Sequence, residues 1–159
     1  MKPPATALNY AVKLLSARPY SERKLREKLA NKFPRDEIDH AIRRLCAERL
    51  LDDQRYAEDF VRVRVATRPR SGFVLVRELM QRGIARGMAQ DVVNRLVPAE
   101  SHENLARELV SRKRAMYRGL DEPTRRRRLT AFLARRGFSY EVIHKVLRIP
   151  PEDGTFDKT

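Results

Sequence analysis

The chain has 159 residues, with 35 Lys and Arg against 21 Asp and Glu, which gives a formal net charge of +14. This length excludes a large multi-domain enzyme and fits one domain or a few small repeats. A hydrophobic fraction of 42% beside 35% charged residues favours a helical core over a buried sheet. The net charge indicates a polyanionic partner, which is nucleic acid, an acidic protein surface or anionic lipid.

Apolar residues recur at helical spacing through residues 1–50, in three stripes that prolines separate. Pro19 lies between the first two stripes and Pro34 between the last two, while Ser21 is placed to cap the second helix. Residues 1–50 are therefore predicted to form a three-helix unit. The stripe residues are Leu8, Ala11, Val12, Leu15, Leu25, Leu29, Phe33, Ile38, Ala41, Ile42 and Leu45.

The same order of elements returns twice after this unit. In residues 51–99, Asp52 is placed to cap the first helix, and Gly83 lies just past the end of the second. In residues 100–149, Gly137 holds the position that corresponds to Gly83. Each of the two segments therefore predicts a further three-helix repeat.

The register of the three units supports a true triplication. Leu29, Leu79 and Leu133 align, and each is followed by a basic residue and then a large apolar one. The first unit lacks the glycine of the others, so we expect its second helix to end differently. The sequence predicts an all-α fold of three tandem three-helix repeats. We expect them to stack into an elongated, curved array, right- or left-handed, with a flexible tail at residues 150–159.

Three segments stand out by their order and spacing: residues 20–29 (YSERKLREKL), 51–57 (LDDQRYA) and 77–84 (RELMQRGI). They resemble the first-repeat signature, the opening of the second repeat and the Glu-Leu-x-x-x-Gly-Ile segment of the RecX family, bacterial regulators of the RecA recombinase. The likeness covers about residues 8–149. It departs at Arg49-Leu50, where the family usually carries Gly-Tyr or a similar pair.

The resemblance implies a non-enzymatic modulator, and specifically an inhibitor, of RecA. Such a protein binds along the helical groove of RecA–DNA filaments and affects filament growth, ATP hydrolysis and strand exchange in DNA repair and the SOS response. Asn9 and Lys13 interrupt the apolar N-terminal stretch, and no segment approaches the ~20 apolar residues of a membrane span. From this pattern we expect a cytoplasmic protein without a membrane contact. With the resemblance, we expect a monomer that contacts RecA, and that contacts DNA without sequence specificity.

Two arginine-rich segments, residues 62–86 and 112–136, supply the candidate contacts with RecA or DNA. Arg68 and Arg70 bracket a proline at a turn, where side chains reach outward. Arg125 begins a run of four arginines that covers all sides of a helix, so at least one must lie near the inner face with its guanidinium reaching out. A solvated basic face is the alternative interpretation of the first segment. In the second, the cations that close a helix at residues 112–118 also suit its C-terminal dipole. The candidates are Arg62, Arg64, Arg68, Arg70, Arg77, Arg82, Arg112, Lys113, Arg114, Arg125, Arg126, Arg127 and Arg128.

No catalytic, cofactor or metal site is expected. Asp52 and Asp53 are adjacent carboxylates at a helix start, which is the usual place for caps. The three histidines lie singly on separate helices, without paired ligand spacing. Cys46, the single cysteine, cannot form an internal disulfide and is most simply a small core residue.

Two other functions remain open from the sequence. The first is a stand-alone, non-sequence-specific DNA-binding helical module, and the second is a repeat scaffold for another acidic partner. Asp36, Glu37 and Asp39 begin the third helix and would repel a DNA backbone, which argues against sequence-specific readout. A DNA-binding module should bind naked DNA tightly with a steep salt dependence, whereas a modulator should prefer RecA-coated DNA.

Overall fold

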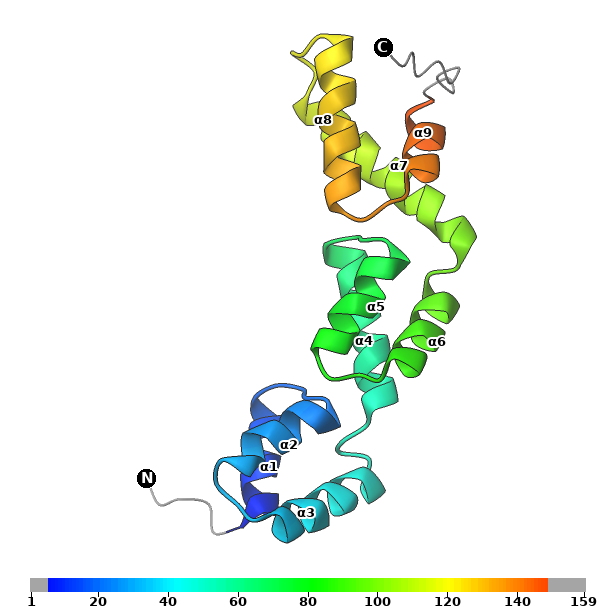
Figure 1. The fold of residues 1–159 in the computed structure, drawn as a ribbon. Helices are drawn as coiled ribbons and strands as arrows, with labels where there is room; N and C mark the ends of the chain where they lie inside the picture. The colour runs from blue at the N-terminus through cyan, green and yellow to red at the C-terminus, as the bar shows by residue number, and fades with distance from the viewer. Residues whose placement is uncertain (1–5, 149–159) are drawn as a thin grey trace, which may run out of the picture. The chain divides into compact units, whose positions relative to one another are not determined.

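The computed structural model describes residues 6–148, and within this range the chain forms helices and no strand (Figure 1). The predicted all-α fold of tandem three-helix repeats is confirmed. The predicted tail at 150–159 lies outside the described residues. The helices are α1 (Ala7–Ala17), α2 (Glu22–Ala30), α3 (Arg35–Ala47), α4 (Asp53–Thr67), α5 (Gly72–Gln81), α6 (Arg86–Leu96), α7 (Ala99–Met116), α8 (Glu122–Arg135) and α9 (Tyr140–Leu147).

Helix starts carry side-chain caps. The Ser21 hydroxyl accepts a hydrogen bond from the Lys24 N–H at 3.3 Å, and the Asp52 carboxylate accepts one from the Arg55 N–H at 3.0 Å. Each cap satisfies an N–H group that has no partner within its own helix. Caps of the same kind begin four further helices, and their residues are Thr6 for α1, Ser71 for α5, Asp121 for α8 and Ser139 for α9.

Helices α5 and α8 end in the left-handed turn that glycine favours. The Ile84 N–H donates to the Leu79 carbonyl at 3.1 Å, and the Gly83 N–H donates to the Met80 carbonyl at 3.0 Å. This is the Schellman pattern, with Gly83 at φ +93°. Helix α8 ends in the same pattern at Gly137, whose φ is +83°.

Helix α3 ends in the same pattern around an arginine. The Leu50 N–H donates to the Leu45 carbonyl at 2.9 Å, and the Arg49 N–H donates to the Cys46 carbonyl at 3.0 Å. Arg49 has φ +55°. Its Cβ makes this conformation costly by roughly 1–2 kcal/mol, a cost that glycine escapes. Arg49 therefore takes, after α3, the left-handed position that glycine takes after α5 and α8.

Helix α2, in the first repeat, ends differently, as predicted. The Phe33 N–H donates to the Leu29 carbonyl at 3.1 Å, so this turn is one residue shorter than the turns after α5 and α8. The cap residue Asn31 keeps right-handed backbone angles, with φ −78° and ψ −5°. No glycine is needed at this position because no left-handed residue follows the helix.

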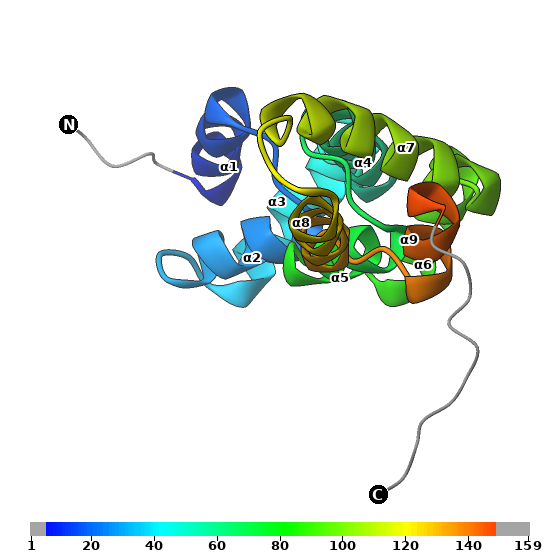
Figure 2. The ribbon, with the colours of Figure 1, turned by 90° about the horizontal axis from the view of Figure 1, so that it is seen from above.

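Each repeat buries the stripe that the sequence marks. Helix α1 packs against α2 and α3, and α7 packs against α8 and α9, with α8 also against α9 (Figure 2). Leu25, Leu29 and Leu45 are fully buried in the first repeat, and Leu133 in the third. The middle repeat buries Ala57, Val61, Leu75, Leu79, Val92 and Val93.

The core prediction is wrong for Cys46 and Val12 in the first repeat. Cys46 is exposed, because Leu45 beside it takes the inner face of α3 and the next residue turns away by about 100°. Val12 is 41% exposed, and Ala11 occupies the buried position of α1. In both cases a neighbour in the sequence fills the inner face.

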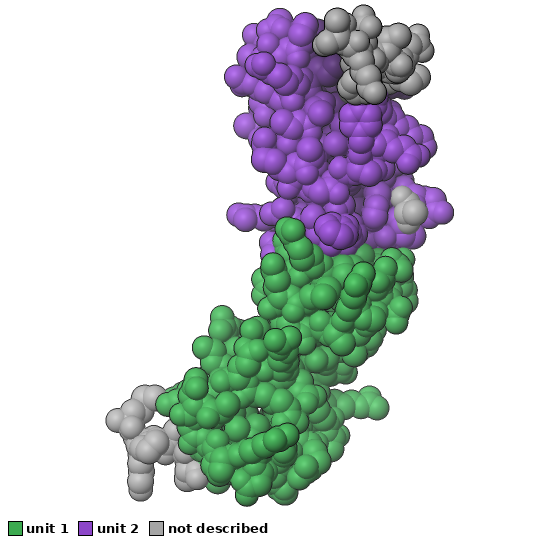
Figure 3. Space-filling model, in the orientation of Figure 1, with its two compact units in different colours: residues 1–63, 75–96 green, residues 64–74, 97–159 purple. Residues whose placement is uncertain are grey.

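The chain divides into two compact units (Figure 3). Unit 1 comprises Met1–Val63 and Leu75–Leu96, and unit 2 comprises Arg64–Val74 and Val97–Thr159. The segment Arg64–Val74 thus belongs by sequence to the middle repeat and by contacts to the third. The turn before α5 therefore packs with the third repeat, although it belongs to the middle repeat by sequence. Among residues 6–148, no helix combines the length and the apolar character of a membrane span.

Candidate functional site: repeat junctions, aromatic cleft and arginine clusters

The first and second repeats meet within unit 1 through a serine and a glycine. Ser21 is fully buried, and its hydroxyl donates to the Arg82 carbonyl at 2.5 Å while it caps α2. Gly83 follows, and a Cβ there would lie 2.8 Å from the Ser21 hydroxyl oxygen and 2.9 Å from the Arg23 Cβ. Glycine is therefore required twice, for the left-handed backbone and for the close approach.

A carboxylate adds a second polar contact at this first junction. The Glu22 N–H, in the first turn of α2, donates to the Asp53 carboxylate at 2.7 Å. Burial raises the pKa of Asp53 above its usual value, although this hydrogen bond opposes the shift. Asp52 caps its own helix α4. The predicted cap is confirmed for Asp52, whereas Asp53 accepts its hydrogen bond from the start of α2 and not from its own helix.

The second and third repeats meet within unit 2 through an equivalent pair. The Ser71 N–H donates to the Arg136 carbonyl at 3.1 Å. A Cβ on Gly137 would overlap a methyl group of Val74 and lie 2.7 Å from the Ser71 hydroxyl oxygen. The Arg136 guanidinium donates to the Pro69 carbonyl at 3.0 Å, and burial lowers its pKa, helped by the nearby charges of other arginines.

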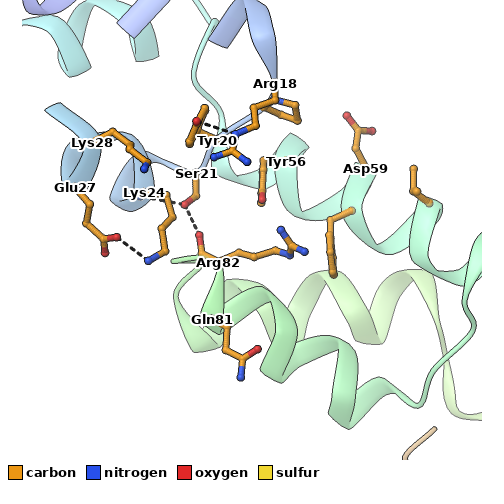
Figure 4. Close-up of a pocket in the computed structure, with 13 residues that line it drawn as sticks. Arg18, Tyr20, Ser21, Lys24, Glu27, Lys28, Tyr56, Asp59, Gln81 and Arg82 are labelled. Atoms are coloured by element: carbon orange, nitrogen blue, oxygen red, sulfur yellow. Dashed lines mark hydrogen bonds and ion pairs between the residues drawn. The ribbon is translucent and has the colours of Figure 1, made fainter. Parts of the chain in front are cut away.

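A cleft of about 580 Å³ opens beside the first junction (Figure 4). We call it the aromatic cleft, because Tyr20, Tyr56 and Phe60 line it together with Val63. Its volume lies in the range of ~300–1,000 Å³ that is typical of small-molecule sites. Four basic residues, Arg18, Lys24, Lys28 and Arg82, and the acidic residues Glu27 and Asp59 complete most of the lining.

Two of the cations in the aromatic cleft lie over aromatic rings. The Arg18 guanidinium is 4.6 Å from the centroid of the Tyr20 ring, and its Nε donates to the Tyr20 hydroxyl at 2.8 Å. The Arg82 guanidinium is 4.6 Å from the centroid of the Phe60 ring. Contacts of this kind hold an arginine in place without neutralising its charge.

The charges in the aromatic cleft are only partly balanced. Lys24 pairs with Glu27 at 2.6 Å. Among the described residues, Arg18, Lys28 and Arg82 take part in no ion pair. The cleft therefore combines aromatic faces with uncompensated positive charge, which suits a planar group that carries an anion.

A second, more polar cleft of about 860 Å³ lies in unit 2. We call it the arginine basin, and its arginines are Arg107, Arg114, Arg118, Arg125 and Arg148. Arg107 pairs with a glutamate of α7 and Arg125 with one of α8, whereas within residues 6–148 the other three form no ion pair. Guanidinium groups gathered in this way suit phosphate or carboxylate oxygens.

The four consecutive arginines of α8 serve three different places. Arg125 lines the arginine basin, while Arg126 and Arg127 line a cleft of about 590 Å³ with Tyr140. The Arg128 guanidinium lies 5.9 Å from the centroid of the Tyr117 ring. The run is therefore spread around α8 and forms no single patch.

Several predicted contact residues are engaged within the protein. Arg62 pairs with Glu58 at 3.2 Å, and Arg112 pairs with the glutamate four residues before it. Lys113 is half-buried, with its ammonium 5.3 Å from the Phe132 ring centroid. These side chains stabilise helices in addition to any contact with a partner.

The remaining candidates differ in exposure. Arg68, Arg77 and Arg114 are exposed, whereas Arg64 is half-buried. Arg70 is also half-buried, so the expectation that Arg68 and Arg70 both reach outward is wrong for Arg70. The reason is that the residue between them, Pro69, is buried and draws the turn into unit 2.

Sequence reasoning missed several lining residues of the two clefts, among them Arg18, Tyr20, Tyr56, Arg107 and Arg148. One signal was available, because RPYS at 18–21 recurs as RPRS at 68–71 and marks the same turn of two repeats. No local signal marks Arg148, which reaches the basin only through the packing of α9 on α7. Within residues 6–148, no group of His, Cys, Asp or Glu side chains is placed to hold a metal ion.

Models of three RecX domains match the chain in order: the first three-helix domain over residues 7–45, the second over 52–93 and the third over 101–147. The regulatory protein RecX of Trichlorobacter lovleyi is 36% identical over 142 residues, which cover 86% of this chain and 90% of that protein. The chain belongs to the RecX family. The RecX of Syntrophotalea carbinolica is 32% identical over 145 residues, which cover 90% and 95% of the two chains.

The RecX fold is also shared with solved structures. A crystal structure of RecX from Lactobacillus salivarius matches with a TM-score of 0.77 at 23% identity, over 89% of this chain and 92% of that chain. A second crystal structure, of a regulatory protein RecX, matches with a TM-score of 0.74 at 24% identity, over 89% of this chain and 71% of that chain. The RecX three-helix repeats therefore retain their fold at low sequence identity.

Proposed function

We propose that this RecX-family protein is a non-enzymatic modulator of the RecA recombinase, and chiefly an inhibitor. It acts in the cytoplasm, as a monomer, by binding along the groove of RecA–DNA filaments and affecting their growth, ATP hydrolysis and strand exchange. The observation that carries the proposal is the match of all three RecX domains, in order, over residues 7–147. The relatives that share this arrangement are named regulatory proteins.

The arginine basin supports a polyanionic filament as the partner. Arg114, Arg118 and Arg148 line it, and among residues 6–148 they form no ion pair, so they keep their full charge for phosphates or carboxylates. The net charge of +14 adds long-range attraction toward a DNA-containing filament. Contacts to phosphates position a protein without reading sequence, which agrees with a partner defined by shape.

The test is the DNA-dependent ATPase of RecA, with strand exchange as a second readout and the protein added below the RecA concentration. We expect both activities to fall, because a groove-bound protein hinders growth of a filament of many subunits. Unchanged ATPase and strand exchange at every ratio would contradict the proposal.

A charge-matched pair of variants tests the arginine basin. Arg114→Glu with Arg118→Glu should weaken inhibition of RecA by about tenfold or more, because two cations of the basin become anions. Arg35→Glu with Arg43→Glu, two exposed arginines of α3, changes the net charge equally and should leave inhibition within about threefold. Equal losses in the two variants would assign the effect to net charge and not to the basin.

A stand-alone DNA-binding module is the second candidate, and the basic composition favours it. The two proposals differ in the substrate that the protein prefers. The modulator should bind RecA-coated DNA more tightly than naked DNA at about 150 mM salt, whereas the module should bind both alike with a steep salt dependence.

A further inference from the structure

We propose that the aromatic cleft of unit 1 binds an unpaired nucleotide of single-stranded nucleic acid, with its base stacked on Tyr56. Arg18, Lys28 and Arg82 contact the neighbouring phosphates. This inference does not rest on the RecA proposal, because it concerns nucleic acid alone and its binding measurements need no RecA.

Tyr56 supplies the stacking surface. It is half-buried on α4, at the first junction, and Figure 4 shows its side chain directed into the same space as Tyr20 and the Arg82 side chain. Among the described residues, its ring takes part in no aromatic or cation–π pair, unlike the Tyr20 ring beneath Arg18. An aromatic face held at the wall of a cleft accepts any base, because every base presents a π face.

The basic residues of the cleft supply phosphate contacts around that ring. Arg18 and Arg82 are held by the Tyr20 and Phe60 rings, so little side-chain entropy is lost when they bind an anion. Lys28 lies about 6 Å further along the same face of α2 than Lys24, whose charge Glu27 balances, and it carries positive charge beyond the reach of one phosphate. A strand that continues beyond the stacked nucleotide can place a second phosphate at Lys28, whereas a free mononucleotide cannot.

The same geometry favours a single strand over a duplex. Bases of a duplex are stacked and paired, so their faces are closed to a tyrosine, while those of a single strand are open. Positive charge with aromatic faces is the combination found in grooves that bind single strands without sequence preference. The carboxylates Glu27 and Asp59 do not oppose this, since Glu27 pairs with Lys24 and Asp59 lies 3.5 Å from Arg62.

The experiment measures binding of a fluorescent oligothymidylate of about 15 nucleotides by anisotropy over a series of salt concentrations. A strand of the same length with abasic sites, and a duplex of the same length, are measured beside it. The wild type should bind oligothymidylate about tenfold more tightly than the abasic strand. Tyr56→Leu should lose about tenfold in affinity and most of that preference, with an unchanged salt slope, because the phosphate contacts remain.

Two further variants separate stacking from charge and from folding. Lys28→Gln should reduce the salt slope by about 0.7, the value for one phosphate of a single strand, and keep the preference for bases. Tyr10→Leu removes a half-buried tyrosine of unit 1 that lies outside the cleft, and should leave binding unchanged. Circular dichroism of all variants checks that each is folded.

Three results would overturn the inference. One is equal affinity of the folded Tyr56→Leu variant and the wild type for oligothymidylate. Another is that thymidine monophosphate competes as well as unlabelled oligothymidylate when both concentrations are counted in nucleotides. This would assign the cleft to free nucleotides. The third is loss of RecA inhibition in Tyr56→Leu with normal single-strand binding, which would assign the cleft to a protein partner.

Discussion

The two repeat junctions share one backbone design and differ in the side chains around it. At each, a buried serine caps the second helix of one repeat and touches the glycine that ends the second helix of the next. At the first junction Arg82 lies over Phe60 and the aromatic cleft opens beside it. At the second, Arg136 donates to the carbonyl of Pro69 and ties the turn to α8. The serine–glycine contact joins the repeats, and the side chains beside it determine whether a cleft for a partner is present.

The two ends of the array support this interpretation. The second helix of the first repeat ends without glycine, because no preceding serine packs against it. In the third repeat, the helix cap that corresponds to Ser21 and Ser71 is Asp121, which is exposed. Serine and glycine therefore occur where a neighbouring repeat needs the space, and other residues replace them where no neighbour lies.

Substitution of the junction glycines should have the largest effect on stability. Gly137→Ala should lower the free energy of unfolding by roughly 2–5 kcal/mol, because a left-handed alanine is strained and its Cβ overlaps Val74. Gly83→Ala should cost somewhat less, since its nearest contact is the Ser21 hydroxyl at 2.8 Å.

Urea unfolding with hydrogen exchange, which assigns each loss to unit 1 or unit 2, measures both glycine variants. Gly119→Ala is the matched control, because no atom lies within 4 Å of the added methyl group. A loss at Gly119 as large as that at Gly137 would remove the junction explanation.

Removal of the serine hydroxyls ranks second. Ser21→Ala should cost roughly 2 kcal/mol, because it removes both the cap of α2 and the hydrogen bond to the Arg82 carbonyl. Ser71→Ala should cost about 1 kcal/mol, the usual value for a cap alone. Ser139→Ala removes an exposed cap outside the junctions and sets the baseline in the same urea titrations. Equal costs for Ser21 and Ser139 would show that the first junction gains nothing from the hydroxyl.

Arg49→Gly should stabilise the protein by roughly 0.5–1 kcal/mol. It relieves the left-handed strain of arginine at φ +55°, and the gain is reduced by the greater freedom of glycine in the unfolded chain. The midpoint of urea unfolding should rise, whereas Arg148→Gly, at φ +48° near the end of the described residues, should raise it less. A lower midpoint for Arg49→Gly would mean that the arginine side chain contributes more than its backbone costs.

The smallest effect concerns an ion pair between the first and third helices of the middle repeat. Glu58 accepts from Arg95 at 2.5 Å, and its pKa falls to about 2 through hydrogen bonds from Arg95 and then Gln54. Because the folded pKa lies below the ordinary 4.5, this stabilisation is complete above pH 4.5 and is lost as the pH falls toward 2. Unfolding of Glu58→Gln, measured across that range, should depend less on pH than unfolding of the wild type. Identical pH dependence would show that Glu58 contributes nothing.

Much of the fold was predictable because its signals are local. Apolar stripes, the caps at Ser21 and Asp52, and the glycines after α5 and α8 all act within one or two helical turns. The clefts were less predictable, since their lining residues come from helices far apart in the sequence. Tyr56 and Arg18 line the same cleft from two different repeats, and each on its own has the pattern of an ordinary helix or turn residue.

The sequence by itself determined the three-helix repeats, their caps and stops, the positive charge and the relationship to RecX, because periodicity and composition are written along the chain. The tertiary structure decided which serine meets which glycine, how the α8 arginines divide among three places, and where aromatic rings and cations form a cleft. These depend on packing between side chains of different helices, and pattern within one helix does not specify such packing.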